Sequence, residues 1–424
     1  MENSYGMGLG AIPLDQAVSE KEKSPNPGWG LGATAGSLFL NQLSYYGVLG
    51  IFTIYLLKVH GWSRESLAIF YTAMVVSNSV SRFVAGIVSD LWLTHKGGTI
   101  LGYLLSVIGF ALLYSAIPGI ALWLGLICVC LGGGLVNVNI RILIGRMYLK
   151  SDSKRHIGFS LNYIGSVLSF LLGNMAILVF GYEQEQMRAN ILTATILSGA
   201  GFLLFFLLKG KIREVELDSQ LKLSTKGLGW IKSVALLALL YTIVTIIAGG
   251  QLSHASGLIT HDEPDGATLY GMLTGFSMQT TIIATGVVIA LVAVLNKPKI
   301  RPFLMAGFIL CLVTAIPSSA LNNDYPDPQT VNSLLFLSFA LFAVADSLIT
   351  PVAYSQLTRY LPVKWASTSL GLIELITGCS IYFGMQYFPK GIDSLVTIMI
   401  VFGLTGLALT VRKRFFTKLL CGLE

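Results

Sequence analysis

Four ionisable side chains lie inside long apolar segments of this chain, and charge in such places usually serves an ion or solute path. Glu374 occurs in the run GLIELITG and Asp346 in FAVADSLITPV, while Arg82 lies in NSVSRFVAG and Arg141 in NVNIRILIG. An ionised group near the middle of a bilayer costs at least about 2.5 kcal/mol, so it usually faces an interior cavity. These four residues therefore favour a transporter over a passive membrane anchor.

The signs of the four charges suggest what they would bind. Arg82 and Arg141 belong to the first half of the chain, and Asp346 and Glu374 belong to the second. A cationic wall facing an anionic wall suits a zwitterion or a carboxylate, which arginine grips with two parallel hydrogen bonds. An apolar cavity hinders ionisation of a carboxyl group and a neighbouring arginine favours it. We therefore expect Asp346 or Glu374 to take up a proton and couple solute movement to the proton gradient.

Other interpretations stay open for the two arginines. Arg82 lies two helical turns from Asp90, so its side chain could instead extend to the cytosolic interface. Arg141 precedes Arg146 by five residues, which also suits a role in a gate or at the interface.

The composition indicates a membrane protein. Hydrophobic residues make up 54% of the 424 residues and charged residues 12%, whereas soluble chains carry about 25% charged residues. A helix needs about 20 mostly apolar residues to cross the hydrocarbon. Twelve segments fit this requirement, namely 31–57, 66–93, 99–117, 119–147, 157–180, 189–208, 228–250, 267–295, 303–321, 332–358, 365–388 and 391–411.

The longest internal hydrophilic connection divides the twelve segments into six plus six. We predict an all-α membrane protein with two six-helix bundles, residues 30–208 and 228–411, joined by a cytosolic linker, 209–227. Residues 1–29 and 412–424 are expected to be cytosolic tails, and no cleavable signal peptide is visible. Such paired bundles place a solute site near the bilayer midplane between the halves.

Basic residues gather on one side of the predicted segments. The linker carries Lys209, Lys211 and Arg213, and the C-terminal tail carries Arg412 and Lys413. Cytoplasmic loops are enriched in lysine and arginine, so we expect both termini in the cytoplasm and the chain in the plasma, or inner, membrane. The basic residues of these loops account for the net charge of +7, so the charge does not call for a nucleic-acid partner. The expected partners are a small-molecule substrate, protons and the lipid bilayer, and the expected oligomeric state is a monomer.

Enzyme chemistry finds no support in the motifs. The five histidines lie in or near predicted loops, and no Ser-His-Asp or paired-histidine metal pattern falls in one site. The five cysteines have no metal-ligand spacing. A phosphate-binding loop of the G-x-x-x-x-G-K-[ST] type is also absent, so ATP is not the expected energy source. We therefore expect no enzyme activity, no metal and no cofactor.

The connection between the second and third segments carries a motif. It reads GIVSDLWLTHKGGT, in which Gly86 would permit close helix contact and Asp90 would accept hydrogen bonds near a helix end. Lys96 follows in the same tight loop. The pattern resembles the signature loop of the major facilitator superfamily, which implies a role for these three residues in conformational change.

Three further stretches resemble the proton-coupled oligopeptide transporter family. NQLSYYGVLGIF (41–52) is similar to its first-helix run with a YYG-type tail. GGGLVNVNIRILIGRMY (132–148) with GFSLNYIGSVLSF (158–170) is similar to its fourth and fifth helices, and ADSLITPVAYSQLTRYLP (345–362) to the tenth-helix pattern G-E-L-L-x-S-P. The order and spacing agree over residues 31 to 390. The resemblance implies a major facilitator fold and peptide symport.

The resemblance and the depth of the residues select further polar candidates. Asp346 stands where that family has a substrate-contacting glutamate. The additional candidates for solute or proton contact are Gln42, Tyr45, Tyr46, Asn137, Tyr163 and Gln279. Tyr45 and Tyr46 are adjacent on a helix, so they point in different directions and one of them is expected to serve packing.

The departures from the family pattern leave the function open between three alternatives. Leu38, Asn41 and Gln42 replace the acids and the arginine of the E-x-x-E-R pattern, and Asn137 replaces the fourth-helix lysine. We expect a secondary transporter for a small zwitterionic or carboxylate-bearing, peptide-like solute, coupled to protons and working by alternating access. The alternatives are a proton-driven exporter of a drug, siderophore or metabolite, and a receptor or sensor that does not transport.

Overall fold

All regular secondary structure in the described part of the chain is helical. The computed structural model describes residues 27–58, 61–115, 120–149, 152, 154–175, 183–214, 229–259, 300–320, 328–387 and 392–411. The first half contains α1 (Gly28–Lys58), α2 (Arg64–Trp92), α3 (His95–Tyr114), α4 (Ile120–Arg146), α5 (Arg155–Asn174), α7 (Gln184–Leu208) and the short η1 (Lys209–Lys211). The second half contains α9 (Gly229–Ile259), α11 (Ile300–Val313), α12 (Ala315–Ala320), α13 (Pro328–Tyr360), η2 (Val363–Trp365), α14 (Ala366–Tyr387) and α15 (Ile392–Val411).

Helices occur at eleven of the twelve predicted segments, and the eighth segment, 267–295, lies outside the described residues. The ninth segment, 303–321, is divided at Thr314 into α11 and α12. Pro317 accounts for the division, because proline has no N–H to donate to the carbonyl of Val313, four residues earlier. At the break, both the backbone N–H and the hydroxyl of Thr314 donate to the Leu310 carbonyl, at 2.9 Å and 2.8 Å.

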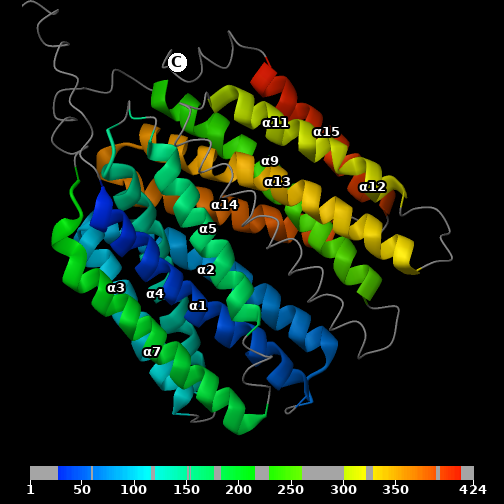
Figure 1. The fold of residues 1–424 in the computed structure, drawn as a ribbon. Coiled ribbons are helices and arrows are strands. Elements are labelled where there is room, and N and C mark those ends of the chain that lie inside the picture. Colours follow the sequence, from blue (N-terminus) through cyan, green and yellow to red (C-terminus); the bar gives the residue numbers. More distant parts are fainter. Residues whose placement is uncertain are drawn as a thin grey trace, which may run out of the picture.

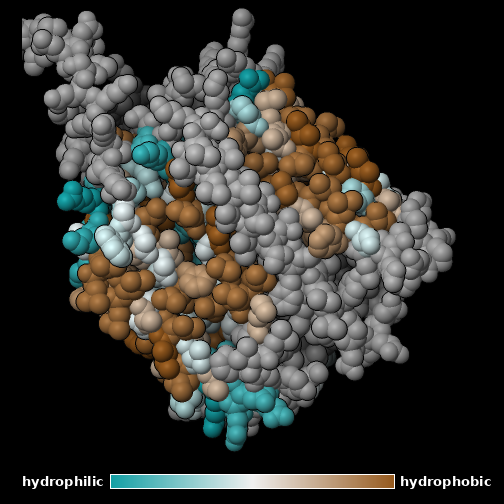
Figure 2. Space-filling model, viewed as in Figure 1, coloured by the Kyte–Doolittle hydropathy of each residue, from teal (hydrophilic) through white to brown (hydrophobic). Residues whose placement is uncertain are grey.

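The flanks of the helices are apolar. Seven helices in the described residues are long and apolar enough to cross a membrane. Large side chains remain exposed on them, including Trp123 at 55% and Leu207 at 75%. Figure 2 shows apolar side chains over much of the helix flanks on one face. Exposed apolar surface of this extent suits contact with lipid.

The two halves of the chain lie beside each other (Figure 1). In the first half α1 packs on α5 and α7, and α3 packs on α4 and α7. In the second half α11 packs on α13 and α15, and α9 packs on α13, α14 and α15. The halves meet where α2 and α4 contact α14, and where α4 and α5 contact α13. Each of the four helices that carry the predicted charges therefore lies at this junction.

Small residues bring α2 and α14 into close contact. A Cβ atom added at Gly86 would lie 2.3 Å from the carbonyl oxygen of Ser367, and one added at Gly371 would lie 2.5 Å from the carbonyl oxygen of Arg82. A side chain at either position would clash with the facing main chain. The two helices can therefore pack this closely only because these positions are glycines. The contact holds Arg82 against the helix that carries Glu374.

A valine at position 86 is expected to force α2 and α14 apart. Overpacking of a tight contact costs about 1–3 kcal/mol, so Gly86→Val should raise hydrogen–deuterium exchange in residues 86–99 and 363–370. Gly133→Ala is the matched control, because no atom lies within 4 Å of a Cβ added there. Unchanged exchange in Gly86→Val would show that the close α2–α14 contact is not maintained in the membrane.

Candidate functional site

The structure brings three of the four predicted charges into one cluster. Arg82 Nη1 lies 2.5 Å from Glu374 Oε2, and Arg141 Nη1 donates to Glu374 Oε1. The arginines come from α2 and α4, whereas the glutamate comes from α14. The Glu374 side chain is 2% exposed, and those of Arg141 and Arg82 are 11% and 18% exposed. The cluster therefore joins the two halves through buried ion pairs.

Two tyrosines, which the sequence did not single out, extend the cluster. The hydroxyl group of Tyr354, on α13, donates to Glu374 Oε1 and accepts from Arg141 Nη1 at 3.1 Å. The Arg141 guanidinium also lies 4.4 Å from the centroid of the Tyr354 ring. The hydroxyl groups of Tyr241, on α9, and Tyr354 are 3.1 Å apart. Glu374 is thus bound by two cations, from α2 and α4, and by one phenol, from α13.

The cluster carries more positive than negative charge. Two guanidinium groups share the single carboxylate of Glu374, so one formal positive charge remains. Arg82 Nε is buried and has no hydrogen-bond partner among the described residues. Buried polar groups are rarely left without a partner. Among the described residues, the cluster therefore has one uncompensated positive charge and one unused hydrogen-bond donor.

Asp346 lies in different surroundings on α13. The hydroxyl groups of Tyr163, on α5, and of Thr350 donate to its two carboxylate oxygens. Among the ion pairs in the described residues, none includes Asp346. The carboxyl group is therefore held by neutral donors across the α5–α13 contact.

The predicted positions on α1 and α4 form a separate polar group. Gln42 Nε2 donates to Asn137 Oδ1 at 2.8 Å, and Ser169 Oγ, on α5, lies 3.3 Å from Gln42 Oε1. Asn137 Nδ2 donates to the Gly133 carbonyl at 2.8 Å. Gln42 and Asn137 are each 5% exposed. Neutral amides thus bind each other at the two positions where the resembled family has charges.

The adjacent tyrosines of α1 face different neighbours. Tyr46 packs edge-on against Phe170, on α5, with ring centroids 4.8 Å apart. Tyr45 packs with an apolar cluster of the first half that includes Val48 and Phe52. Both rings are partly buried. Gln279, the remaining predicted contact residue, lies outside the described residues.

The signature loop links the halves at the end of α2. Asp90 accepts hydrogen bonds from the backbone N–H groups of Ser367 at 3.2 Å and Thr368 at 2.6 Å. These groups belong to the first turn of α14, which lacks internal acceptors for them. Lys96 donates to the Ile212 carbonyl at 2.7 Å and lies 3.9 Å from Glu214. Asp90 therefore caps a helix of the other half, and Lys96 fixes the beginning of the linker.

A second link lies at the start of α5. Arg155 is 1% exposed, and its guanidinium donates to the Ser355 carbonyl at 3.1 Å and to Thr358 Oγ1 at 2.9 Å. Both acceptors belong to α13. The halves are therefore joined by hydrogen bonds at the ends of α2 and α13 as well as by the buried ion pairs.

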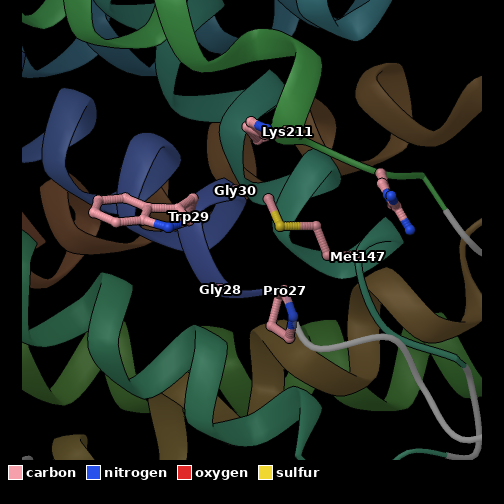
Figure 3. A pocket seen from close by; sticks show the side chains of 7 residues that line it. Pro27, Gly28, Trp29, Gly30, Met147 and Lys211 are labelled. Carbon is pink, nitrogen blue, oxygen red and sulfur yellow. The ribbon is translucent and has the colours of Figure 1, made fainter.

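A pocket of about 340 Å³ lies at the start of α1 (Figure 3). Trp29, Met147 and Lys211 contribute side chains from α1, the end of α4 and η1. The remaining lining residues are Pro27, Gly28, Gly30 and Arg213. None of them belongs to the charge cluster, so this pocket is distinct from the candidate site. Among the described residues, no group of three or more His, Cys, Asp or Glu side chains could hold a metal ion.

Several curated proteins resemble parts of the chain. Dipeptide and tripeptide permease B of Salmonella typhimurium is 27% identical over 219 residues, which cover 50% of this chain and 42% of that protein. Dipeptide and tripeptide permease A of Serratia proteamaculans is 33% identical over 140 residues, 31% of this chain and 27% of that protein. The peptide transporter YePEPT of Yersinia enterocolitica is 26% identical over 235 residues, 51% of this chain and 45% of that protein. The chain thus spans less than half the length of these relatives.

Solved structures share the fold over nearly the whole chain. A POT family transporter in complex with 5-aminolevulinic acid has a TM-score of 0.58 and 15% identity, and covers 92% of this chain and 96% of its own. The human organic anion transporter TETRAN has a TM-score of 0.70 and 13% identity, and the match covers 91% of this chain and 100% of that chain. FucP, in the outward conformation, has a TM-score of 0.62 and 14% identity, and the match covers 91% of this chain and 98% of that chain.

The family assignment rests on one long match. A family model described as Major Facilitator Superfamily matches residues 34–385. This range includes every residue of the charge cluster and the signature loop around Asp90. The chain is therefore an integral, multi-pass membrane protein that belongs to the major facilitator superfamily.

Proposed function

We propose that this chain is a secondary active transporter for a small zwitterionic or carboxylate-bearing, peptide-like solute, driven by protons and working by alternating access. The observation that supports it most is the buried cluster in which Arg82 and Arg141 of one half bind Glu374 of the other. Isolated buried ion pairs seldom add stability, because desolvation offsets their attraction. Ionisable residues that occur inside a membrane despite the cost of desolvation usually lie along the path of a transported ion or solute.

The surplus charge favours an anionic group on the solute. A carboxylate that enters the cluster neutralises the remaining positive charge of Arg82 and Arg141, and it supplies an acceptor for Arg82 Nε, which has no partner among the described residues. Arginine binds a carboxylate with two parallel hydrogen bonds. The solute then competes with Glu374 for the two cations, which weakens the contact between the halves. Solute binding and the movement of the halves are thereby coupled.

Asp346 offers a protonation site that is independent of the arginines. A carboxyl group surrounded by neutral hydroxyl donors can carry a proton into the junction without breaking an ion pair. Its position on α13, beside Tyr163 of α5, connects this protonation to the contact between the halves.

The relatives support the solute class. Proteins that resemble parts of this chain are named dipeptide and tripeptide permeases. One structure with the same fold holds 5-aminolevulinic acid, a molecule that carries both an amino group and a carboxyl group. Gln42 and Asn137 replace charges at the family positions, so the carboxylate contacts would come from Arg82 and Arg141 instead.

The hydrogen bonds that join the halves at one end of the molecule must break for the site to open at that end. Asp90 and Arg155 bind backbone groups or hydroxyl groups of the other half at the ends of α14 and α13. We assign this end to the cytosol from the basic residues of the loops, with both termini on the same side. Release of solute into the cytosol then requires these hydrogen bonds to break. The plasma, or inner, membrane and a monomeric state complete the proposal.

Transport by purified protein in liposomes tests the proposal. Labelled alanyl-alanine should accumulate when the lumen is alkaline relative to the outside, and a protonophore should abolish the accumulation. Counterflow exchange should persist without a pH gradient. Binding without counterflow would instead support a receptor or sensor, and accumulation only in inside-out vesicles would support an exporter. A screen in which only non-peptide carboxylates stabilise the protein would remove peptides from the proposal.

Lysine at position 141 is expected to weaken solute binding by about tenfold to a hundredfold. Lysine keeps the charge but cannot make two parallel hydrogen bonds to a carboxylate, a difference of about 1.4–2.8 kcal/mol. The concentration dependence of counterflow measures this change. Arg146→Lys is the matched control, because Arg146 lies on the same helix but binds Glu214 at 3.1 Å, away from the cluster. Equal affinities in the two variants would contradict direct contact between Arg141 and the solute.

A further inference from the structure

The pocket at the start of α1 has a basic lining that the proposed transport cycle does not use. Its volume is about 340 Å³, which lies within the range of small-ligand pockets. Figure 3 shows Trp29, Met147 and Lys211 around it, from the start of α1, the end of α4 and η1. Arg213, just after η1, is the second charged residue of the lining. Both charged groups are cations, and among the described residues no acidic side chain lines the pocket.

The nearby acid is already paired with other cations. Glu214 follows Arg213 directly, but its carboxylate lies 3.1 Å from Arg146 Nη1 and 3.9 Å from Lys96 Nζ. Within the part of the chain that the structure describes, none of the ion pairs includes Lys211 or Arg213. The positive charges of these two side chains are therefore not compensated there, and they favour an anionic occupant.

The backbone that carries the two cations is held on α1 and α3. A Cβ atom added at Gly30 would lie 2.9 Å from the carbonyl oxygen of Lys211, so this glycine lets η1 pack on the main chain of α1. Ile212 is 2% exposed, and its carbonyl accepts from Lys96 Nζ at 2.7 Å. Lys211 and Arg213 flank this buried residue and are themselves exposed. The fold thus fixes the two cations beside the pocket at their main chain, while their side chains remain accessible.

The surroundings of the pocket match the boundary between lipid tails and headgroups. Trp29 is 77% exposed, and Phe206 and Leu207, in the last turn of α7, are 42% and 75% exposed. Lys209 Nζ lies 3.8 Å from the centroid of the Phe206 ring, an arrangement typical of lysine at the end of a membrane-spanning helix. Tryptophan and basic residues gather at this depth of membrane proteins. An occupant of the pocket would therefore meet apolar surface as well as cations.

We propose that this pocket binds the phosphate headgroup of an anionic membrane lipid. Arg213 can bind two phosphate oxygens with parallel hydrogen bonds, and Lys211 adds a second positive charge. Trp29 contacts the glycerol region of the lipid, and the acyl chains follow the exposed flank of α7 at Leu207. A free phosphate has no apolar part, so the exposed apolar side chains favour a lipid as the source of the group. The site requires only that the chain lies in a membrane, and it is independent of the transported solute and of proton coupling.

Native mass spectrometry of the purified, delipidated protein tests this site. Dioleoylphosphatidylglycerol is the anionic lipid, and dioleoylphosphatidylcholine, whose headgroup has no net charge, is the reference. Replacing both cations, Lys211→Gln with Arg213→Gln, should weaken binding of phosphatidylglycerol by about tenfold or more and leave binding of phosphatidylcholine unchanged. Lys154→Gln with Lys364→Gln is the matched control, because it removes the same charge before α5 and in η2, outside the pocket. This control should bind phosphatidylglycerol as the wild type does.

Two further measurements distinguish a lipid from a free phosphate. A large molar excess of inorganic phosphate should not displace phosphatidylglycerol, and Trp29→Ala should weaken lipid binding although it changes no charge. Displacement by phosphate, or unchanged lipid binding in Trp29→Ala, would contradict a lipid occupant.

The paired variants separate a defined site from general attraction to a basic surface. Equal losses of phosphatidylglycerol in the two double variants would show attraction without a site, and wild-type binding in Lys211→Gln with Arg213→Gln would show that the pocket binds no anionic lipid. Either result overturns the proposal. Both replaced cations are exposed, so the variants should fold, and thermal unfolding without added lipid checks that they do.

Discussion

Replacing Glu374 by glutamine is expected to abolish accumulation driven by a pH gradient and to make the remaining transport independent of pH. Glutamine has nearly the same shape as glutamate but carries no charge, so Arg82 and Arg141 lose their shared counter-ion. Breaking one partner of a buried ion pair costs about 3–5 kcal/mol. The variant should therefore also unfold at a lower temperature in detergent, as measured by thermal unfolding of the purified protein.

A compensating variant separates the loss of charge from the loss of shape. Removing a second charge with Arg82→Gln in the Glu374→Gln background leaves Arg141 as the single cation of the cluster. Thermal stability should recover in this double variant, whereas proton-driven accumulation should not. Wild-type, pH-dependent uptake in Glu374→Gln would show that the ion-pair cluster has no part in coupling.

Replacing Asp346 by asparagine is expected to remove the pH dependence of uptake while exchange persists. Asparagine can still accept a hydrogen bond from Tyr163 or Thr350, but it cannot gain or lose a proton at this position. Accumulation under a pH gradient should fall by about tenfold or more, and counterflow should stay within about twofold because Arg82, Arg141 and Glu374 are unchanged. Both quantities are measured in the same liposomes.

Asp152→Asn provides the matched control for this experiment. Asp152 lies between α4 and α5, where its carboxylate accepts a hydrogen bond from the backbone N–H of Lys154 at 2.8 Å. Its replacement should leave the pH profile of uptake unchanged. Retention of the wild-type profile in Asp346→Asn as well would exclude Asp346 as the coupling acid, and loss of counterflow would assign it to solute contact instead.

The rarity of charge in apolar segments identified the principal residues of the candidate site. Arg82, Arg141 and Glu374 stood out from the sequence because burial of an unpaired ion in lipid is costly. Which charges pair could not be predicted, because Arg82 and Glu374 are 292 positions apart. Only the packing of α2 against α14 brings them together, and this packing depends on the whole fold.

The tyrosines of the cluster were not predicted, because phenols are common in membrane helices and usually serve packing or the interface. One indication was present for Tyr354, which follows Asp346 by eight residues and so lies on a similar face of α13. Tyr241 lies alone in an apolar run, and nothing in its neighbours indicates a partner.

The helices were predictable where length and hydropathy determine them. The first segment, expected over 31–57, is helical over Gly28–Lys58. The division of the ninth segment was missed, although Pro317 was visible in it, because the hydropathy of the segment continues across the break. Membrane burial is a property of composition, whereas hydrogen bonding along a helix depends on single residues.

The glycine contact between α2 and α14 has a kinetic consequence. Gly86 and Gly371 meet main-chain atoms rather than interlocking side chains, so parting these two helices requires no rotamer changes at those points. No side chains interdigitate at these two points. The helices can therefore separate and rejoin there without an activation barrier from side-chain rearrangement. The resistance to separating the halves should then come from the ion pairs around Glu374 and from the hydrogen bonds of Asp90 and Arg155, and not from the glycine contact itself.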